Sequence, residues 1–232
     1  AHGCVVRECR QRCRKVGSMT DAETRSFLSS YAKEVVGGSA ACFVGAGLSR
    51  AAGFVDWKGL VRELAEEIGL DVDREHDLLA VAQFHLNERK NRSRIHKVIL
   101  EQFTRDAEPS EAVEILASLP ITKYWTTNYD CLIEEALKSQ NRKADVKIRS
   151  EDLAHSLPDR SAVVYKMHGD VSSPSTAVLT KHDYEMYDKN RGLFSEALQG
   201  VLVSNTFLFS CFRFTNQNSS AELSTIHHLL GP

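Results

Sequence analysis

The stretch ACFVGAGLSRAAG, residues 41–53, predicts a buried strand that ends in a glycine-rich loop. Its first four residues are uncharged and mostly apolar, and Gly45 and Gly47 follow with one residue between them. Glycines let a backbone approach a phosphate-bearing ligand closely, but they also occur in plain strand-to-helix turns, and both interpretations stay open for this loop alone. Arg50 stands where a dinucleotide-binding fingerprint has its third small residue, and no acidic residue follows a second strand at the usual distance of about 20. The loop is therefore a poor match to an ordinary dehydrogenase.

Two further polar clusters each follow a short strand-like run: TTNYD at residues 126–130 and KMHGD at residues 166–170. Because the carboxyl ends of parallel strands meet at one edge of a sheet, the three loops are expected to share a crevice. Within it, Asn128 is a neutral donor and acceptor, and His168 is expected to titrate near neutral pH and to act as a general base. Taken alone, Asn-Tyr-Asp before a helix most often caps that helix, and a histidine before glycine is often a turn residue.

Strand-like and helix-like segments alternate along the chain, which predicts an α/β fold with a doubly wound, Rossmann-like parallel sheet. Residues 19–232 are expected to form one domain. A small helical insertion is expected at about 74–118, and its first part, 74–105, has the pattern of two charged amphipathic helices. The expected strands are 40–44, 121–126, 144–148, 162–167 and 206–210.

The composition favours a soluble protein without a nucleic-acid surface. The 232 residues include 29 basic and 31 acidic side chains, a net charge of −2, so no general positive field is available for direct nucleic-acid binding. No apolar run reaches the roughly 18 residues of a membrane span, and the N-terminus has no apolar signal segment. Cys42, Cys131 and Cys211 are scattered through apolar or helical stretches, which is typical of buried thiols in a reducing compartment. A cytoplasmic location is expected.

The first 18 residues are expected to be a non-native or disordered leader. They are rich in arginine, lack helical periodicity, and run into a Gly-Ser-Met sequence at 17–19 that is typical of a cloning junction. A basic arm or a metal-binding tip is the alternative, but the cysteines there are not joined by a second pair at zinc spacing.

The three loops together resemble the sirtuin-like (silent-information-regulator) family. The family's Gly-Ala-Gly-Leu-Ser loop, Thr-Asn-Tyr-Asp cluster and His-Gly-Asp cluster occur here in the family's order and cover about residues 45–170. Trp57 after the glycine loop and Tyr129 between Asn128 and Asp130 are more similar to the bacterial branch found in anti-phage defence proteins that hydrolyse NAD than to the protein-deacylase branch. The resemblance implies an NAD+ glycohydrolase that releases nicotinamide and ADP-ribose.

The resemblance also implies roles for individual residues. Asn128 matches the residue whose loss abolishes NAD cleavage, His168 is the second expected catalytic residue, and Asp170 is a candidate for orienting the imidazole. Loss of nicotinamide through an oxocarbenium-like transition state needs a held ribose and an oxygen nucleophile on one face, and little covalent chemistry from the protein. Backbone N–H groups of the glycine loop would face the pyrophosphate. The expected NAD-contacting residues are Gly45, Ala46, Gly47, Ser49, Arg50, Thr127, Asp130 and Gly169, of which Arg50 could equally form a surface ion pair.

Two departures from the family's pattern keep alternatives open. Deacylases of the family usually carry two Cys-x-x-Cys pairs after the histidine, whereas Cys211 is the one cysteine between His168 and Pro232, so no zinc module and no metal cofactor are expected. Relatives often have Gly-Phe-Ser-Phe-Thr-Asp after the last strand, and CFRFTN at 211–216 alters the adenosine side and indicates an atypical or truncated C-terminal end. An NAD-dependent protein deacylase and a catalytically silent NAD or ADP-ribose sensor are the alternatives.

The basic run RKNRSR at 89–94 is expected to be a solvated turn between two helices, with a contact to a partner or a pyrophosphate as the less favoured interpretation. An unrestrained NAD hydrolase would exhaust its host's cofactor, and the resemblance implies control by assembly. The expected partners are further copies of the chain, and a HerA-type DNA-translocating ATPase or an Argonaute-like protein. Charge reversal at Arg89, Lys90 and Arg92 is expected to alter assembly without touching the three loops.

Overall fold

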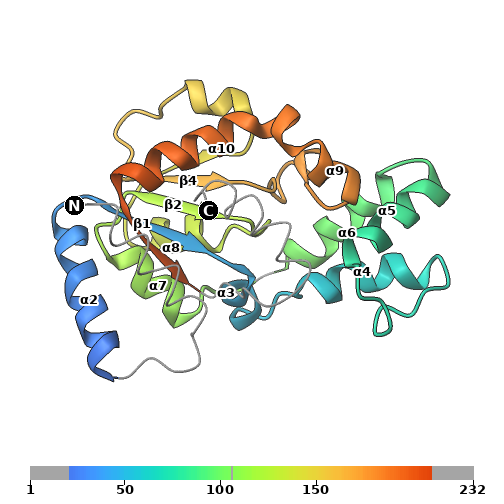
Figure 1. Ribbon diagram of the computed structural model, residues 1–232, viewed down its shortest axis with the longest axis horizontal. Coiled ribbons are helices and arrows are strands. Elements are labelled where there is room, and N and C mark those ends of the chain that lie inside the picture. Colours follow the sequence, from blue (N-terminus) through green and yellow to red (C-terminus); the bar gives the residue numbers. More distant parts are fainter. Residues whose placement is uncertain (1–20, 106, 211–232) are drawn as a thin grey trace.

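The computed structural model describes residues 21–105 and 107–210, which form one five-stranded parallel sheet with helices on both faces (Figure 1). The strand order is β3-β4-β2-β1-β5. The strands are β1 (Ala40–Val44), β2 (Lys123–Thr126), β3 (Ala144–Lys147), β4 (Ala162–Lys166) and β5 (Thr206–Ser210). The predicted doubly wound α/β fold is confirmed, and each strand lies within its expected range. The leader expected at 1–18 and the altered motif at 211–216 lie outside the described residues.

The central strand β1 is apolar throughout because helices cover both of its faces. Ala41 and Phe43 belong to the hydrophobic cluster under α10 (Tyr187–Ser204). Cys42 and Val44 belong to the cluster on the opposite face, under α2 (Asp21–Val36) and α8 (Leu132–Ser139). Side chains alternate between the two faces of a strand, so a polar residue anywhere in β1 would be buried in one apolar layer or the other.

The chain changes direction in the sheet at β1. The next three strands all lie on one side of β1, and β5 returns at the end to its other side. In open α/β sheets, ligands bind outside the carboxyl ends of the strands at such a point. Val44, Thr126 and Lys166 are the last residues of the adjacent strands β1, β2 and β4, and the three predicted polar loops begin at or directly after them.

Beyond the sheet, α4, α5 and α6 lie together at one end of the molecule (Figure 1). Asp56 begins α4, because its side chain accepts a hydrogen bond from the Gly59 N–H (2.9 Å). The expected insertion at 74–118 also includes α7, which packs against α8 beside the sheet, and the bounds of the insertion stay a prediction. The helices are α3 (Ala46–Ala51), α4 (Trp57–Glu66), α5 (Leu78–Arg89), α6 (Ser93–Phe103), α7 (Glu111–Ser118) and α9 (Lys181–Glu185), with short helices η1 (Ser150–Ala154) and η2 (Pro174–Thr176).

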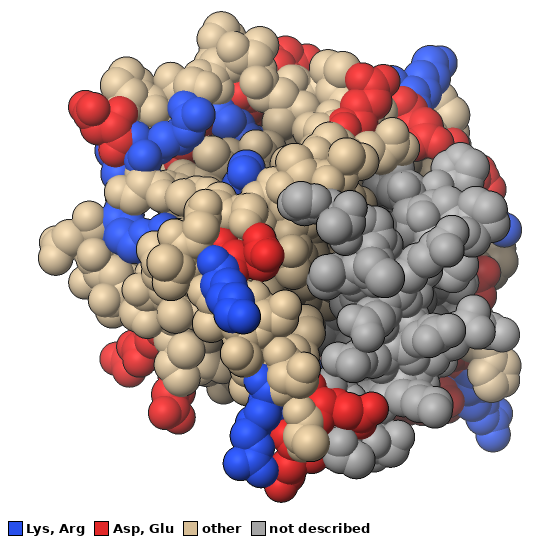
Figure 2. Space-filling view, turned by 60° about the vertical axis from the view of Figure 1, so that its left-hand side comes forward, with Lys and Arg blue, Asp and Glu red and all other residues tan. Residues whose placement is uncertain are grey.

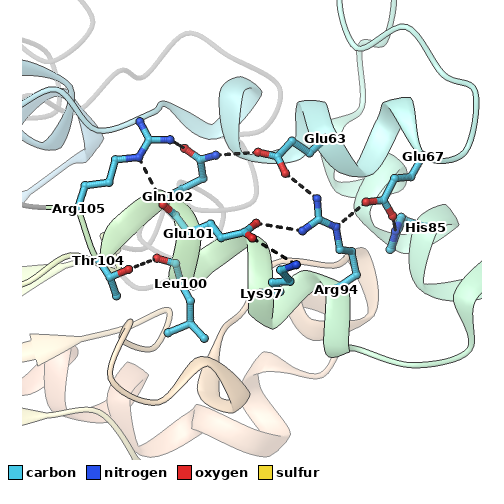
Figure 3. A network of polar contacts seen from close by, with 10 residues as sticks. All are labelled: Glu63, Glu67, His85, Arg94, Lys97, Leu100, Glu101, Gln102, Thr104 and Arg105. Atoms are coloured by element: carbon cyan, nitrogen blue, oxygen red, sulfur yellow. Dashed lines mark hydrogen bonds and ion pairs between the residues drawn. The ribbon is translucent and has the colours of Figure 1, made fainter.

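The expectation that the basic run 89–94 is solvated is wrong for two of its arginines. Arg94 donates to Glu63 (2.7 Å) and Glu67 (2.5 Å) at α4 and to Glu101 (3.0 Å) on its own helix (Figure 3). These bonds join α6 to α4.

Arg92 is the second of these arginines. It makes a two-pronged ion pair with Asp183 on α9 (2.8 and 2.9 Å) and donates to the carbonyl oxygen of Ala177 (3.0 Å). Charge reversal at Arg92 would therefore break an internal contact, so it does not test assembly. Lys90, by contrast, is exposed.

Arg142 connects two strands at the amino edge of the sheet. Its guanidinium donates to the carbonyl oxygens of Ala117 (2.8 Å), Leu119 (2.6 Å), Ile121 and Ser161 (3.4 Å). The first of these oxygens lies in the last turn of α7, the next two lie between α7 and β2, and the fourth directly precedes β4. This set of bonds, the Arg142 clamp, ties the approaches of two neighbouring strands together.

No helix in the described part of the chain is both long and apolar enough to cross a membrane. On the face shown in Figure 2, acidic and basic side chains are interspersed. This distribution agrees with the small net charge of −2.

Candidate active site

Asn128 and His168 lie at the same level of the carboxyl edge of the sheet. In the neighbouring strands β2 and β4, Thr126 pairs with Lys166, and each of the two site residues lies two positions beyond that pair. In β1, Val44 pairs with Thr126, so the glycine loop begins at the same level. The sheet therefore brings the three predicted loops together.

The glycine loop is bonded to a strand end on each side. The Gly45 N–H donates to the carbonyl oxygen of Ser210 (3.0 Å) at the end of β5, and the Gly45 carbonyl accepts from Asn128 Nδ2 (3.1 Å). Gly45 is buried, Ala46 is exposed and Gly47 is half-buried, the last two in the first turn of α3. The side-chain amide of Asn128 is thus oriented by the glycine loop itself.

Thr126 holds the main chain of the Asn128 loop, a role that the sequence did not reveal. Its hydroxyl donates to the Val44 carbonyl (2.9 Å) and accepts from the Asn128 N–H (3.0 Å). Thr127 and Asn128 are both 9% exposed. Asn128 is therefore fixed through its main chain by β2 and through its side chain by the loop after β1.

Ser49 and Asp130 link two of the loops through their side chains. Ser49 Oγ donates to Asp130 Oδ2 (2.5 Å), and Asp130 Oδ1 accepts from the Leu132 N–H (3.1 Å) in the first turn of α8. Both residues are buried. Arg50 lies outside this group, because it is exposed and its guanidinium is 3.8 Å from the Asp56 carboxylate, the geometry of a weak surface ion pair.

His168 is buried among aromatic side chains. Its Nδ1 lies 3.5 Å from the Tyr184 hydroxyl, and the rings of Tyr184 and Tyr187 stand edge-on to it at centroid distances of 5.3 and 6.1 Å. Burial, and after it the positive charge of Arg191, lowers the pKa of His168 to about 3. The expectation that His168 titrates near neutral pH is therefore wrong, and its imidazole is neutral at physiological pH.

Lys166 is a site residue that the sequence analysis missed. It is fully buried. Its Nζ lies 3.0 Å from Asp170 Oδ2 and 3.2 Å from Glu134 Oε1, and it also donates a hydrogen bond to the carbonyl oxygen of Asp130. Burial alone would lower the pKa of Lys166, but the carboxylates of Glu134 and Asp170 raise it above its usual value. Asp170 also accepts from the Ser172 N–H (2.8 Å), and its expected role in orienting the imidazole stays a prediction. The available signal was a lysine at the end of a strand whose other residues are uncharged.

Gly169 follows His168 at a position that excludes other residues. Its φ is +93°, and a Cβ placed on it would lie 2.6 Å from the carbonyl oxygen of Thr176. The backbone after His168 is thus packed directly against η2.

Residues 21–105 and 107–210 contain no group of three or more histidine, cysteine, aspartate or glutamate side chains placed to hold a metal ion. The acidic groups at the carboxyl edge are instead bonded to protein donors, Asp130 to Ser49 and Asp170 to Lys166.

The sequence matches a family model and several curated proteins. The SIR2-like domain model matches residues 122–231, which include the loops after β2 and β4. NAD(+) hydrolase ThsA of Bacillus cereus (strain MSX-D12) is 50% identical over 201 residues, which cover 86% of this chain and 42% of the relative. NAD(+) hydrolase ThsA of Cytobacillus dafuensis is 43% identical over 217 residues, which cover 94% of this chain and 43% of the relative.

A more distant relative, Defense-associated sirtuin 2 of Bacillus subtilis, is 25% identical over 228 residues, which cover 94% of this chain and 22% of the relative. The chain spans less than half the length of each of these relatives. Together with the parallel sheet and the three loops at its carboxyl edge, these matches show that the chain carries a sirtuin-like (SIR2-like) domain.

Proposed function

We propose that this chain is the NAD-cleaving part of an anti-phage defence effector and that it hydrolyses NAD to nicotinamide and ADP-ribose. The observation that carries the proposal is the position of Asn128 and His168, at one level of neighbouring strand ends and beside the glycine loop that binds the Asn128 amide. The names of the relatives, NAD(+) hydrolase and defense-associated sirtuin, support it.

In this reaction the bond between the ribose C1′ and the nicotinamide nitrogen breaks, and its electron pair leaves with nicotinamide. A water oxygen then bonds to C1′ and the water loses one proton. We assign Asn128 to orienting the water or the ribose hydroxyls, and His168 to accepting the hydrogen bond and then the proton of the water. The proposed contacts to the nucleotide are Gly45, Ala46, Gly47, Ser49, Arg50, Thr127, Asp130 and Gly169.

A neutral His168 suits this chemistry. Its low pKa leaves the ring able to accept a hydrogen bond at neutral pH. A dissociative transition state needs little help from a strong base, because the leaving group departs before the water attacks. The two phosphates of NAD would add negative charge near the ring and so raise its pKa toward the range of an effective base.

The proposal is tested by following nicotinamide release from NAD with and without an acylated peptide. We expect release without the peptide, and a loss of at least about a hundredfold in His168→Ala. Release that depends on the peptide would identify a deacylase instead, and NAD binding without turnover would identify a sensor. A loss of less than about tenfold in His168→Ala would remove the residue from the mechanism.

We also propose that the protein works in the cytoplasm as a homo-oligomer, without a metal, and that a HerA-type DNA-translocating ATPase or an Argonaute-like protein raises its rate. EDTA is expected to leave the rate and the melting temperature unchanged. The rate is expected to rise with protein concentration as the oligomer forms, measured by light scattering alongside the assay. Lys90→Glu, a substitution at an exposed position of the insertion, should weaken the dependence of the rate on protein concentration. A monomer whose rate is already maximal would contradict the proposed control by assembly.

A further inference from the structure

Arg191 is a buried arginine whose guanidinium binds four backbone carbonyl oxygens. One of its terminal nitrogens donates to Ile148 (3.0 Å), Lys166 (3.3 Å) and Met167 (3.1 Å), and the other donates to Thr176 (2.7 Å). The side chain is 8% exposed. The main chain of α10 departs from helical geometry at this residue, with φ −136° and ψ 18°, so the helix bends where it presents this side chain to the sheet.

Of these four bonds, the Arg191 clamp, one goes to Ile148 beyond β3 and the other three lie before and after His168 in the chain. The carbonyls of Lys166 and Met167 belong to the two residues that directly precede His168. The carbonyl of Thr176 is the atom against which Gly169, the next residue, is packed. A single side chain therefore binds the backbone before the imidazole directly and, after it, binds the carbonyl against which Gly169 packs.

We propose that Arg191 is a positioning residue that sets the orientation of the His168 imidazole at the carboxyl edge of the sheet. Its planar fork with several donors can bind several carbonyl oxygens at once, which the single ammonium of a lysine cannot match in geometry. Tyr187, four residues earlier on the same helix, adds a second bond to the same backbone, because its hydroxyl donates to the Met167 carbonyl (3.1 Å). The inference rests on the proposed role of His168 in NAD hydrolysis.

The charge of Arg191 adds to the effect of its geometry. Around His168, α9 contributes Tyr184 and α10 contributes Tyr187 and Arg191. Asp170 on the same loop is bound by Lys166, and Asp130 on the neighbouring loop is bound by Ser49. A guanidinium whose bonds are to neutral carbonyls disfavours a second positive charge nearby, so it helps to keep the imidazole neutral and able to accept a hydrogen bond.

The test compares Arg191→Lys and Arg191→Met with Arg142→Lys in the whole 232-residue chain. Arg142→Lys is the matched control, because it removes the same fork from four carbonyl oxygens at the opposite edge of the sheet. Three quantities are measured for each variant: the melting temperature, the NMR signal of the His168 Cε1 in chains with ¹³C-labelled histidine, and kcat and KM for nicotinamide release. The His168 signal is assigned by its loss in His168→Gln.

We expect Arg191→Lys to move the His168 signal, since the orientation of the ring toward Tyr184 and Tyr187 determines its ring-current shift. We expect kcat to fall on the order of tenfold or more with a smaller change in KM, because a displaced base loses its alignment with the reacting water. Arg191→Met should in addition let His168 bind a proton at a higher pH than in the wild type. Arg142→Lys should lower the melting temperature and leave the signal and kcat unchanged.

An unmoved His168 signal in Arg191→Lys would overturn the proposal, and so would an equal movement in Arg142→Lys. If Arg191→Lys does not fold while Arg142→Lys does, Arg191 is a structural residue and the positioning role is rejected. The NMR signal needs no substrate. A wild-type chain that leaves NAD intact would therefore refute the proposed function while the signal still decides the question of Arg191.

Discussion

Arg142 and Arg191 each bind four backbone carbonyl oxygens, at opposite edges of one sheet, and the groups around them differ. Beside Arg142 stands Tyr124, whose hydroxyl accepts a bond from it (3.3 Å) and whose pKa burial raises to about 12, so that this phenol stays neutral. Beside Arg191 the sheet buries His168 and, at the same edge, Lys166, whose pKa the carboxylates of Glu134 and Asp170 raise so that it stays charged. An arginine therefore binds backbone at both edges, and the groups beside it distinguish the two.

The charged side chains that the two edges bury can also be compared. A buried ion pair stabilises a fold little more than an apolar pair of similar volume does. Removing one partner of the pair, however, lowers the free energy of unfolding by several kcal/mol. Both edges bury ion pairs: Asp145, level with Lys123 at the amino edge, binds Lys147 (2.8 Å), and at the carboxyl edge the fully buried Lys166 lies between Glu134 and Asp170. Strongly shifted pKa values concentrate at functional sites, and the carboxyl edge holds two of them, the lowered pKa of His168 and the raised pKa of Lys166, in agreement with the proposed position of the active site.

The largest expected contrast between the edges is in catalysis. Asn128→Ala should abolish nicotinamide release, a loss of about a thousandfold or more, because the amide is the proposed holder of the water or ribose. Asn205→Ala is the matched change at the amino edge. Asn205 is 8% exposed, close to the 9% of Asn128, and its amide oxygen accepts from Lys123 Nζ (3.2 Å). Equal losses in both variants would show that the edges do not differ in function.

The second contrast is in stability. Lys166→Met should lower the free energy of unfolding by about 3–5 kcal/mol in urea titrations, because Glu134 and Asp170 lose their buried cation. At the amino edge Lys123→Met removes one hydrogen bond from a partly buried amine and should cost about 1 kcal/mol. Adding Glu134→Gln to Lys166→Met should restore part of the loss. Similar losses of unfolding free energy in Lys166→Met and Lys123→Met would mean that the cluster around Lys166 contributes no more to stability than a single hydrogen bond.

The smallest contrast is in the pH dependence of stability. His168 has a pKa of about 3 in the fold, below the value of about 6.5 in an unfolded chain. Between these values the unfolded state binds the extra proton, so the stability from this group is complete above about pH 6.5 and is lost as the pH falls toward 3, by up to about 1.4 kcal/mol per pH unit. Between pH 6.5 and 5, His168→Gln should therefore reduce the slope of the unfolding free energy against pH by up to about 1.4 kcal/mol per pH unit, the value for one proton.

An exposed histidine supplies the control for this measurement. His155→Gln, on the segment after η1, is the matched substitution, and the slope of the wild type is the reference for both variants. If His168→Gln also keeps that slope, the imidazole is not the group that the fold holds neutral, and the buried environment assigned to it is wrong.

The strands, and the edge of the sheet where the site residues lie, could be predicted from the sequence because they depend on local patterns. Residues 40–44 and 206–210 are apolar or β-branched runs bounded by turn residues, and β1 and β5 lie there without a shift. Asn128 and His168 could be placed at one edge because both follow strands, and in a parallel sheet all such ends meet. Each of these inferences needs only the residues within a few positions.

The parts that escaped prediction depend on partners far along the chain. Arg191 binds carbonyls of residues 15 to 43 positions away, and a backbone carbonyl has no signature in a sequence. The pKa of His168 was misjudged for the same reason, since burial under Tyr184 and Tyr187 follows from how α9 and α10 pack. Arg92 looked solvated because its partner, Asp183, lies 91 residues later.

The glycine after His168 offers a way to sort related sequences without any assay. A side chain at position 169 would collide with the Thr176 carbonyl, the same oxygen that receives the fourth bond of Arg191. A natural variant with another residue there must have moved η2 away, and with it one side of the enclosure around the imidazole. Among homologues, a glycine at 169 together with an arginine at 191 should accompany an intact site, and the loss of one should be followed by the loss of the other. Under the proposed function, chains that keep both residues are expected to release nicotinamide faster than chains that have lost either one.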